Sequence, residues 1–175
     1  MMTEGRNMAT YEEANKLALG YYSGDTMAPA VFLSKYALRD GNNNILEETP
    51  DIMYRNRIAP NLARIEAKYP NPLSEEEIYS YLCKRPDRLG MGPIVPQGSP
   101  LSGIGNPFKI QSISNCFVIG SPEDSCAGIF YTDQQEAQIM KRRGGVGFDI
   151  SSIRPRGFVT ANAAGTTDGI SVFIS

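Results

Sequence analysis

The feature that most constrains the fold is a strand–helix–strand pattern in the last third of the chain. Residues 110–119 carry apolar side chains on both faces, which predicts a strand that is covered on both sides. A helix is expected from a cap at Thr132 to Arg143, with Gly144-Gly145 ending it, and residues 146–150 are expected to form a second short strand. Together with helical segments upstream, this pattern indicates an α/β architecture.

Helix-start signals mark the first ninety or so residues. Thr10 with Glu13 and Ser74 with Glu77 have the form of capping boxes, in which a hydroxyl and a carboxylate satisfy the free N–H groups of a helix start. Thr49 precedes a proline at the first helical position, where a missing N–H costs nothing. These signals predict a layer of packed helices.

An apolar stripe follows the third of these starts. Ile58, Leu62, Ile65 and Tyr69 recur at helical spacing and are expected to face the core together. Pro60 lies inside the stripe, so we expect a kink or a break near residue 59.

The composition changes at Pro86, where a segment rich in glycine, proline and serine begins and continues to Pro107. Such a composition is typical of a loop and disfavours a helix or a central strand. A loop of this length inside a compact protein is more often functional than a passive connection.

Composition and charge exclude several classes of protein. The chain has 17 basic and 19 acidic residues, so its charge favours neither nucleic acid nor an anionic membrane as a partner. No apolar run approaches the roughly 18 residues of a transmembrane helix, and the N-terminus has no secretory apolar region, so we expect a cytoplasmic protein. The sequence has no histidine and no CxxC motif, which predicts that the chain holds no metal site.

Three local features suggest chemistry, and each has a plainer explanation. Cys116 lies in the predicted strand SNCFVIG, where a thiol also serves simply as a small apolar core residue. The segment KRRGGVGFD has glycines that let a ligand approach the backbone, although a helix end explains at least one of them. The arginines of IRPRG either clamp a phosphate chain or are merely solvated.

In this order and spacing, SNCFVIG, EDS, a helix and RRGGVGFDISSIRPRG resemble the large catalytic subunit of ribonucleotide reductases. The resemblance extends upstream through PQGSPLSGIGN and begins at about Tyr11. It implies an N-terminal helical region over residues 1–95 and, over residues 96–175, the first strands of a ten-stranded α/β barrel with its substrate and effector loops. The overall similarity is greatest to adenosylcobalamin-dependent members.

The resemblance also implies roles for individual residues. Cys116 matches one of the two barrel cysteines that reduce the ribose and become a disulfide. Ser99 matches a hydroxyl that touches the substrate, and Gly144 and Gly145 match backbone positions that line the substrate. Asn115 stands where many members carry serine beside the cysteine, so we expect a substrate contact there as well.

A second group of residues maps to the allosteric site of this family. There a deoxynucleoside triphosphate binds at the subunit interface and selects the base that is reduced. Asp124 and Ser125 match the pair that contacts the effector sugar, and Arg154 matches the arginine at its phosphates. Both kinds of contact are charge-assisted hydrogen bonds. Cys126 stands where the family usually has an apolar residue, so we expect it to pack.

The radical-bearing cysteine and the second reducing cysteine of the family lie beyond the matched segment. We therefore expect a split or truncated catalytic subunit that binds ribonucleotide and effector, forms an oligomer, and needs a complementary C-terminal fragment. Adenosylcobalamin is the expected radical source, with a separate metal-radical subunit as the alternative.

Two other interpretations stay open. One is a regulatory module that retains the effector site without turnover. The other is an ordinary nucleotide-binding α/β domain that uses RRGGVG, although a strand–GxGxxG–helix order is lacking.

Overall fold

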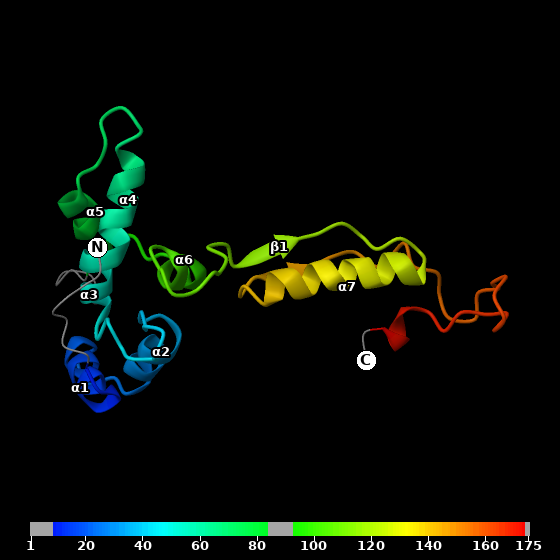
Figure 1. The fold of residues 1–175 in the computed structure, drawn as a ribbon, viewed down its shortest axis with the longest axis horizontal. Helices are drawn as coiled ribbons and strands as arrows, with labels where there is room; N and C mark the ends of the chain where they lie inside the picture. Colours follow the sequence, from blue (N-terminus) through cyan, green and yellow to red (C-terminus); the bar gives the residue numbers. More distant parts are fainter. Residues whose placement is uncertain (1–8, 84–92, 174–175) are drawn as a thin grey trace. The chain divides into compact units, whose positions relative to one another are not determined.

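The computed structural model describes residues 9–83 and 93–173. The chain divides into two compact units, Met1–Ile113 and Ser114–Ser175 (Figure 1). We expected the barrel to begin at residue 96. This boundary differs in kind from the division into compact units, and it stays a prediction.

The first unit begins with two packed helices, α1 (Tyr11–Tyr21) and α2 (Met27–Lys35). The capping box at Thr10 is confirmed, because its hydroxyl accepts a hydrogen bond from the backbone N–H of Glu13 and the Glu13 carboxylate accepts from the Thr10 backbone N–H. The turn after α1 contains Ser23 and Gly24, both of which have a positive φ (55° and 89°).

A continuous helical rod follows, made of α3 (Pro50–Met53), a π-helical turn η1 (Tyr54–Ile58) and α4 (Ala59–Glu66). Pro60 lacks an N–H, and its ring crowds the carbonyl four residues earlier. The π-turn, in which the backbone N–H of Ala59 donates to the Tyr54 carbonyl, lets the helix pass this point. The irregularity near residue 59 is therefore confirmed as a π-turn and not as a break.

The predicted apolar stripe is buried only at its beginning. Ile58 is fully buried and Leu62 packs against the core, whereas Ile65 and Tyr69 are 44% and 61% exposed. The expectation for these last two residues was wrong, because α4 extends past the helices that cover its start. The core of the unit is made of these buried side chains: Ala14, Ala18, Phe32, Leu33, Ile45, Met53, Tyr54, Ile58, Ala59, Ile78 and Leu82.

Two further helices complete the described part of the first unit. α5 (Glu75–Leu82) starts at the predicted capping box of Ser74. α6 (Gly98–Gly103) lies in the segment that we expected to be a loop without helix, so that expectation was wrong. A short helix is possible there because Pro100 occupies its first turn, where the N–H groups have no helical partner. The Ser102 hydroxyl also donates to the Gly98 carbonyl at 3.0 Å. Part of the predicted loop, residues 86–92, falls outside the described residues.

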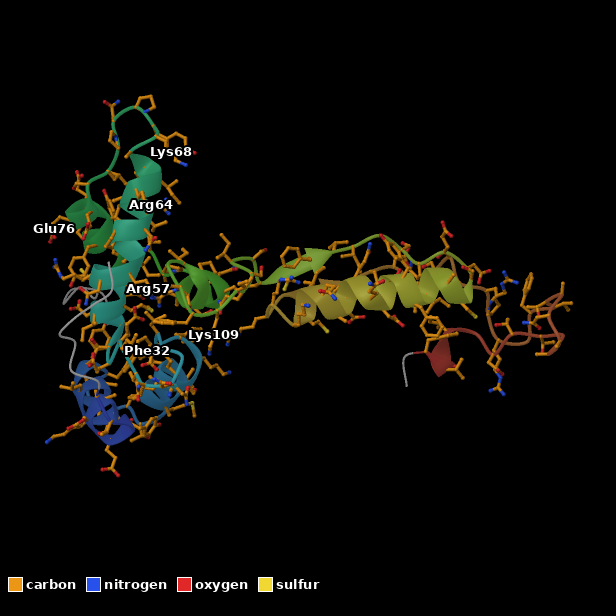
Figure 2. The ribbon with its side chains drawn as sticks, viewed as in Figure 1. Phe32, Arg57, Arg64, Lys68, Glu76 and Lys109 are labelled. Atoms are coloured by element: carbon orange, nitrogen blue, oxygen red, sulfur yellow. The ribbon has the colours of Figure 1, made fainter. Side chains whose placement is uncertain are left out.

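Arg57, labelled on the helical rod in Figure 2, forms a buried ion pair with Glu47 and also bonds to α6. Arg57 and Glu47 are 4% and 1% exposed, and Arg57 Nε lies 2.7 Å from Glu47 Oε1. Arg57 also donates to the carbonyls of Leu101 and Ile104 at 2.9 and 2.6 Å, and Glu47 accepts from the Leu38 backbone N–H at 3.0 Å. These bonds compensate the cost of burying two charges.

The second unit contains the parallel strands β1 (Cys116–Val118) and β2 (Gly145–Gly147), with helix α7 (Cys126–Met140) between them in sequence. Figure 1 shows α7 beside β1, and α7 also contacts β2. A 3-10 turn, η2 (Ile170–Val172), lies near the end of the described chain. The strand–helix–strand order is confirmed, and with the first unit it gives a helical region followed by a two-stranded parallel sheet.

Two details of this unit differ from the expectation. Thr132 is a buried residue inside α7, and the cap is Ser125, whose hydroxyl accepts from the Gly128 backbone N–H at 3.0 Å. The first strand is three residues long and not covered on both faces, since Val118 is 91% exposed. Two strands and one helix supply too little surface to cover both faces of a sheet, so residues 110–119 are less buried than their apolar pattern predicts.

Candidate functional site

Cys116 and Gly145 are partners in the parallel sheet. The Gly145 backbone N–H donates to the Asn115 carbonyl at 2.7 Å, and a Cβ placed on Gly145 would lie 3.4 Å from the Cys116 sulfur. The thiol is free and exposed. The structure thus brings three of the predicted site residues together at one point of the sheet, where a Cβ on the glycine would be in van der Waals contact with the thiol.

Gly144 meets a different constraint. A Cβ at this position would lie 2.6 Å from Ile139 Cγ2 and 2.8 Å from Phe117 Cε2, so a larger residue cannot fit. Arg143, just before it, has a left-handed backbone (φ 67°) that ends α7. Glycine at 144 is therefore required by the packing of α7 against β1, and the substrate contact expected of its backbone stays a prediction.

Ser99 is the second residue of α6 and belongs to the first unit, so its expected meeting with the substrate at Cys116 also stays a prediction.

A cavity of about 480 Å³ lies within the second unit. Its walls come from the start of α7, the turn at residues 153–154, a small hairpin over residues 157–167, and the η2 region. All three residues that we expected at an effector, Asp124, Ser125 and Arg154, line it. The volume falls in the range of small-molecule and cofactor pockets.

Asp124 and Arg154 form an ion pair at the wall of this cavity. Arg154 Nε donates to Asp124 Oδ2 at 2.5 Å, Nη2 donates to the Asp124 carbonyl at 3.2 Å, and the Arg154 backbone N–H approaches Asp124 Oδ1 at 3.3 Å. The two side chains are 33% and 35% exposed, so the pair is in reach of solvent and of a ligand. The nearby Ser152 hydroxyl donates to the Pro122 carbonyl at 2.8 Å and fixes the same two segments to each other.

The start of α7 forms another part of the wall. Ser125 caps the helix and Gly128 must be glycine, because a Cβ there would lie 2.7 Å from the Glu123 carbonyl oxygen. Cys126 is exposed and lines the cavity, so our expectation that it packs was wrong. It is the first residue of α7.

Several residues of this region were missed by sequence reasoning. The hairpin closes through a bridge between Val159 and Thr166 and through the Thr160 backbone N–H, which donates to the Gly165 carbonyl at 3.0 Å. Glycines at both ends of this segment are a turn signal that could have revealed it. Asp168, after the hairpin, also lines the cavity and had no distinguishing signal in the sequence.

Asp149 lies just after the glycine cluster. The Ser151 hydroxyl and then its backbone N–H donate to this carboxylate and lower the pKa of Asp149 below its usual value. Among the described residues, no group of three or more Cys, Asp or Glu side chains is arranged to hold a metal ion. No helix in the described ranges is long and apolar enough to cross a membrane.

Comparison with known families adds to this geometry. Residues 114–175 match the family model of the ribonucleotide reductase barrel domain. The matched segment coincides with the second compact unit, Ser114–Ser175, which holds both the Cys116–Gly145 pairing and the cavity. The part of the chain with the candidate site is therefore similar to a ribonucleotide reductase barrel domain.

The curated relatives that the chain matches are named as ribonucleoside-diphosphate reductases. The chain is 34% identical over 84 residues to the "Ribonucleoside-diphosphate reductase large subunit" of Trypanosoma brucei brucei, covering 48% of this chain and 10% of that subunit. It is 41% identical over 58 residues to the large subunit of Caenorhabditis elegans, covering 33% and 7%. A "Vitamin B12-dependent ribonucleoside-diphosphate reductase" of Mycobacterium tuberculosis is 28% identical over 144 residues, covering 81% and 19%. The chain thus spans between 7% and 19% of the length of these three relatives.

Proposed function

We propose that this chain supplies the N-terminal part of a ribonucleotide reductase catalytic subunit and works together with the rest of that subunit. The observation that carries the proposal is that the segment matching the barrel domain is also a compact unit, in which Cys116 meets Gly145 and Asp124 meets Arg154. Ribonucleotide reduction, the ten-stranded barrel and the oligomeric assembly are all parts of this proposal.

In the proposed reaction, Cys116 is one of two reducing thiols. Two thiols give up two electrons and two protons to form a disulfide, while the ribonucleotide loses its 2′-hydroxyl as water and becomes a deoxyribonucleotide. The free, exposed sulfur beside Gly145 supports this role, because a substrate can approach the thiol where the glycine has no side chain. The second thiol belongs to the complementary fragment. Ser99 and the backbone around Asn115, Gly144 and Gly145 are proposed to hold the substrate.

The cavity is proposed to bind a deoxynucleoside triphosphate effector. Asp124 would accept hydrogen bonds from sugar hydroxyls, Ser125 would donate its hydroxyl hydrogen, and Arg154 would bind phosphate. A guanidinium has more N–H donors than the bonds to Asp124 use, so Arg154 can hold Asp124 and a phosphate together. The start of α7 adds the partial positive charge of a helix N-terminus.

Adenosylcobalamin is proposed as the radical source, with a separate metal-radical subunit as the alternative. The relative named as B12-dependent matches the largest share of this chain, while relatives of higher identity are named without that cofactor. No residue of this chain is assigned to the cofactor. When bound, the cofactor would supply the radical that starts the reaction.

A regulatory module that keeps the effector site without turnover is the second candidate. It is favoured by one observation: Cys116 does not line the cavity, so an effector site can persist without the reducing thiol.

The proposed function is tested by combining the chain with the C-terminal remainder of a catalytic subunit and measuring deoxyribonucleotide formation under reducing conditions. Turnover is expected only with both parts present. Cys116→Ser should abolish multiple turnover, because a hydroxyl cannot form the disulfide, whereas Cys83→Ser, at the end of α5, should leave it nearly intact. Equal turnover of the Cys116 variant and the parent would remove this cysteine from the reaction, and nucleotide binding without turnover would favour the regulatory module.

A further inference from the structure

The end of α6 is held by a side chain from the helical rod. The last carbonyl groups of a helix have no partner within it, so a short helix depends on donors from outside. Arg57 supplies two such donors: its Nη2 donates to the Leu101 carbonyl at 2.9 Å, and its Nη1 donates to the carbonyl of Ile104, the C-cap residue, at 2.6 Å. The guanidinium therefore joins the end of α6 to the rod.

The direction of this guanidinium is itself fixed. Arg57 donates through Nε and Nη2 to the two carboxylate oxygens of Glu47, at 2.7 and 2.9 Å, and both side chains are almost fully buried. A bidentate pair of this kind sets the plane of the guanidinium as well as its position. The Glu47 carboxylate is held in turn by the Leu38 backbone N–H at 3.0 Å. The N–H groups that bond to α6 thus come from a fixed point.

Glycines let both ends of α6 lie close to their neighbours. Gly105, just after the helix, has a left-handed backbone (φ 67°), and a Cβ there would lie 3.0 Å from Arg57 Cγ. At the other end, a Cβ on Gly98 would lie 3.1 Å from Cε1 of Tyr36, the C-cap residue of α2. Ser99 follows Gly98 directly and is half-buried. The place of Ser99 therefore depends on how α6 is held against the rod and α2.

We propose that Arg57 is a positioning residue of the substrate site, because its bonds to the carbonyls of α6 set where Ser99 lies. The inference rests on the proposed function, in which Ser99 helps to hold the ribonucleotide. It goes further by adding a residue that acts on substrate affinity without touching the substrate. A hydrogen bond weakens steeply when its distance and angle change, so a small shift of α6 is enough to lose the contact of Ser99.

The test combines the full 175-residue chain with the C-terminal remainder of a catalytic subunit and measures KM and kcat for the ribonucleotide. Arg57→Lys is the variant of choice, since it keeps a positive charge beside Glu47. A lysine ammonium cannot replace a planar fork that bonds a carboxylate and two carbonyls together. We expect KM to rise about three- to tenfold, the size of one lost hydrogen bond to the substrate. The value of kcat should stay nearly unchanged, because that contact is made before and during the reaction alike.

A double-mutant cycle separates positioning from a general loss of structure. Ser99→Ala should raise KM by itself, and Arg57→Lys should raise it no further in the Ser99→Ala background, because a positioning residue acts through the hydroxyl that it positions. A general loss of structure would instead add to the effect of Ser99→Ala. Arg55→Lys is the matched control, since Arg55 lies on the same rod and pairs with Glu76 of α5 at the surface. It should keep the KM of the parent.

The possible failures are distinguishable. If Arg57→Lys leaves KM unchanged, or raises it equally with and without Ser99→Ala, the positioning role is overturned and the proposed function stands. If the parent turns over and Ser99→Ala keeps its KM, Ser99 does not hold the substrate, and the inference is overturned for that reason. If the parent shows no turnover with the complementary part, the proposed function itself is wrong.

Discussion

The two units each contain an arginine–carboxylate pair, and the two pairs have opposite surroundings. Arg57 and Glu47 in the first unit are almost fully buried, whereas about a third of Arg154 and of Asp124 in the second unit is exposed. The N–H groups of the buried arginine donate to one carboxylate and to backbone carbonyls of neighbouring segments. The exposed arginine keeps part of its guanidinium at the wall of a cavity.

This difference separates a structural role from a binding role. A buried charge must be fully compensated inside the protein, so its partners are fixed by the fold and no ligand can be added. A half-exposed pair contributes little to stability, because water screens it, but it remains accessible to a ligand and is already oriented by its partner.

The largest effect is expected in the first unit. Arg57→Ala should lower the free energy of unfolding by about 3–5 kcal/mol, because it leaves the Glu47 carboxylate buried without its partner. Arg55→Ala is the control, since the Arg55–Glu76 pair is exposed and screened by water, and it should cost much less. Denaturant unfolding of both variants measures this, and equal losses would contradict the structural role of the buried pair.

Arg154→Ala should affect ligand binding more than stability. We expect deoxynucleoside triphosphate binding to weaken by about 1.5–3 kcal/mol, the usual range for a hydrogen bond to a charged group, as measured by calorimetric titration. The unfolding free energy should change by less than about 1 kcal/mol, since the ion pair is partly exposed. Arg142→Ala, at the far end of α7 and outside the cavity, should leave the affinity unchanged. An unaltered affinity in the Arg154 variant would remove this arginine from the site.

The smallest effect is expected at the cap of α7. Ser125→Ala removes the hydroxyl that accepts from Gly128 and should cost about 1 kcal/mol of stability. Ser125→Asp is the informative partner, because aspartate caps a helix equally well but adds a negative charge to the cavity wall. It should restore the unfolding midpoint while weakening nucleotide binding. Restored stability together with parental affinity would exclude Ser125 from the nucleotide contacts.

Local signals in the sequence predicted local structure well. The capping boxes at Thr10 and Ser74 formed as expected because each depends on groups three residues apart. The cap of α7 was misplaced at Thr132, since a hydroxyl residue before an apolar stretch does not reveal whether its side chain faces the helix end or the interior. Ser125 and Thr132 differ mainly in burial, which depends on contacts with other elements.

Contacts between residues far apart in the sequence were harder to predict. No local sequence pattern predicts that Glu47 and Arg57 are buried. Arg57 donates to the carbonyls of Leu101 and Ile104, which lie more than forty residues further along the chain. Asp124 and Arg154 are thirty positions apart, and their meeting was expected only through the family resemblance. The exposure of Val118 shows the converse limit: an apolar pattern predicts burial, but the surface that would cover it must come from other elements.

The most direct test of a nucleotide site at Asp124 and Arg154 uses a thiol in the same cavity. Cys126 is exposed and lines it, while Cys83 lies in the first unit and serves as an internal reference. The measurement is the alkylation rate of each cysteine in the full chain, followed by mass spectrometry, with and without a saturating deoxynucleoside triphosphate and Mg²⁺. We predict that the nucleotide slows alkylation of Cys126 and leaves the rate at Cys83 unchanged. Equal Cys126 rates with and without nucleotide would contradict the account.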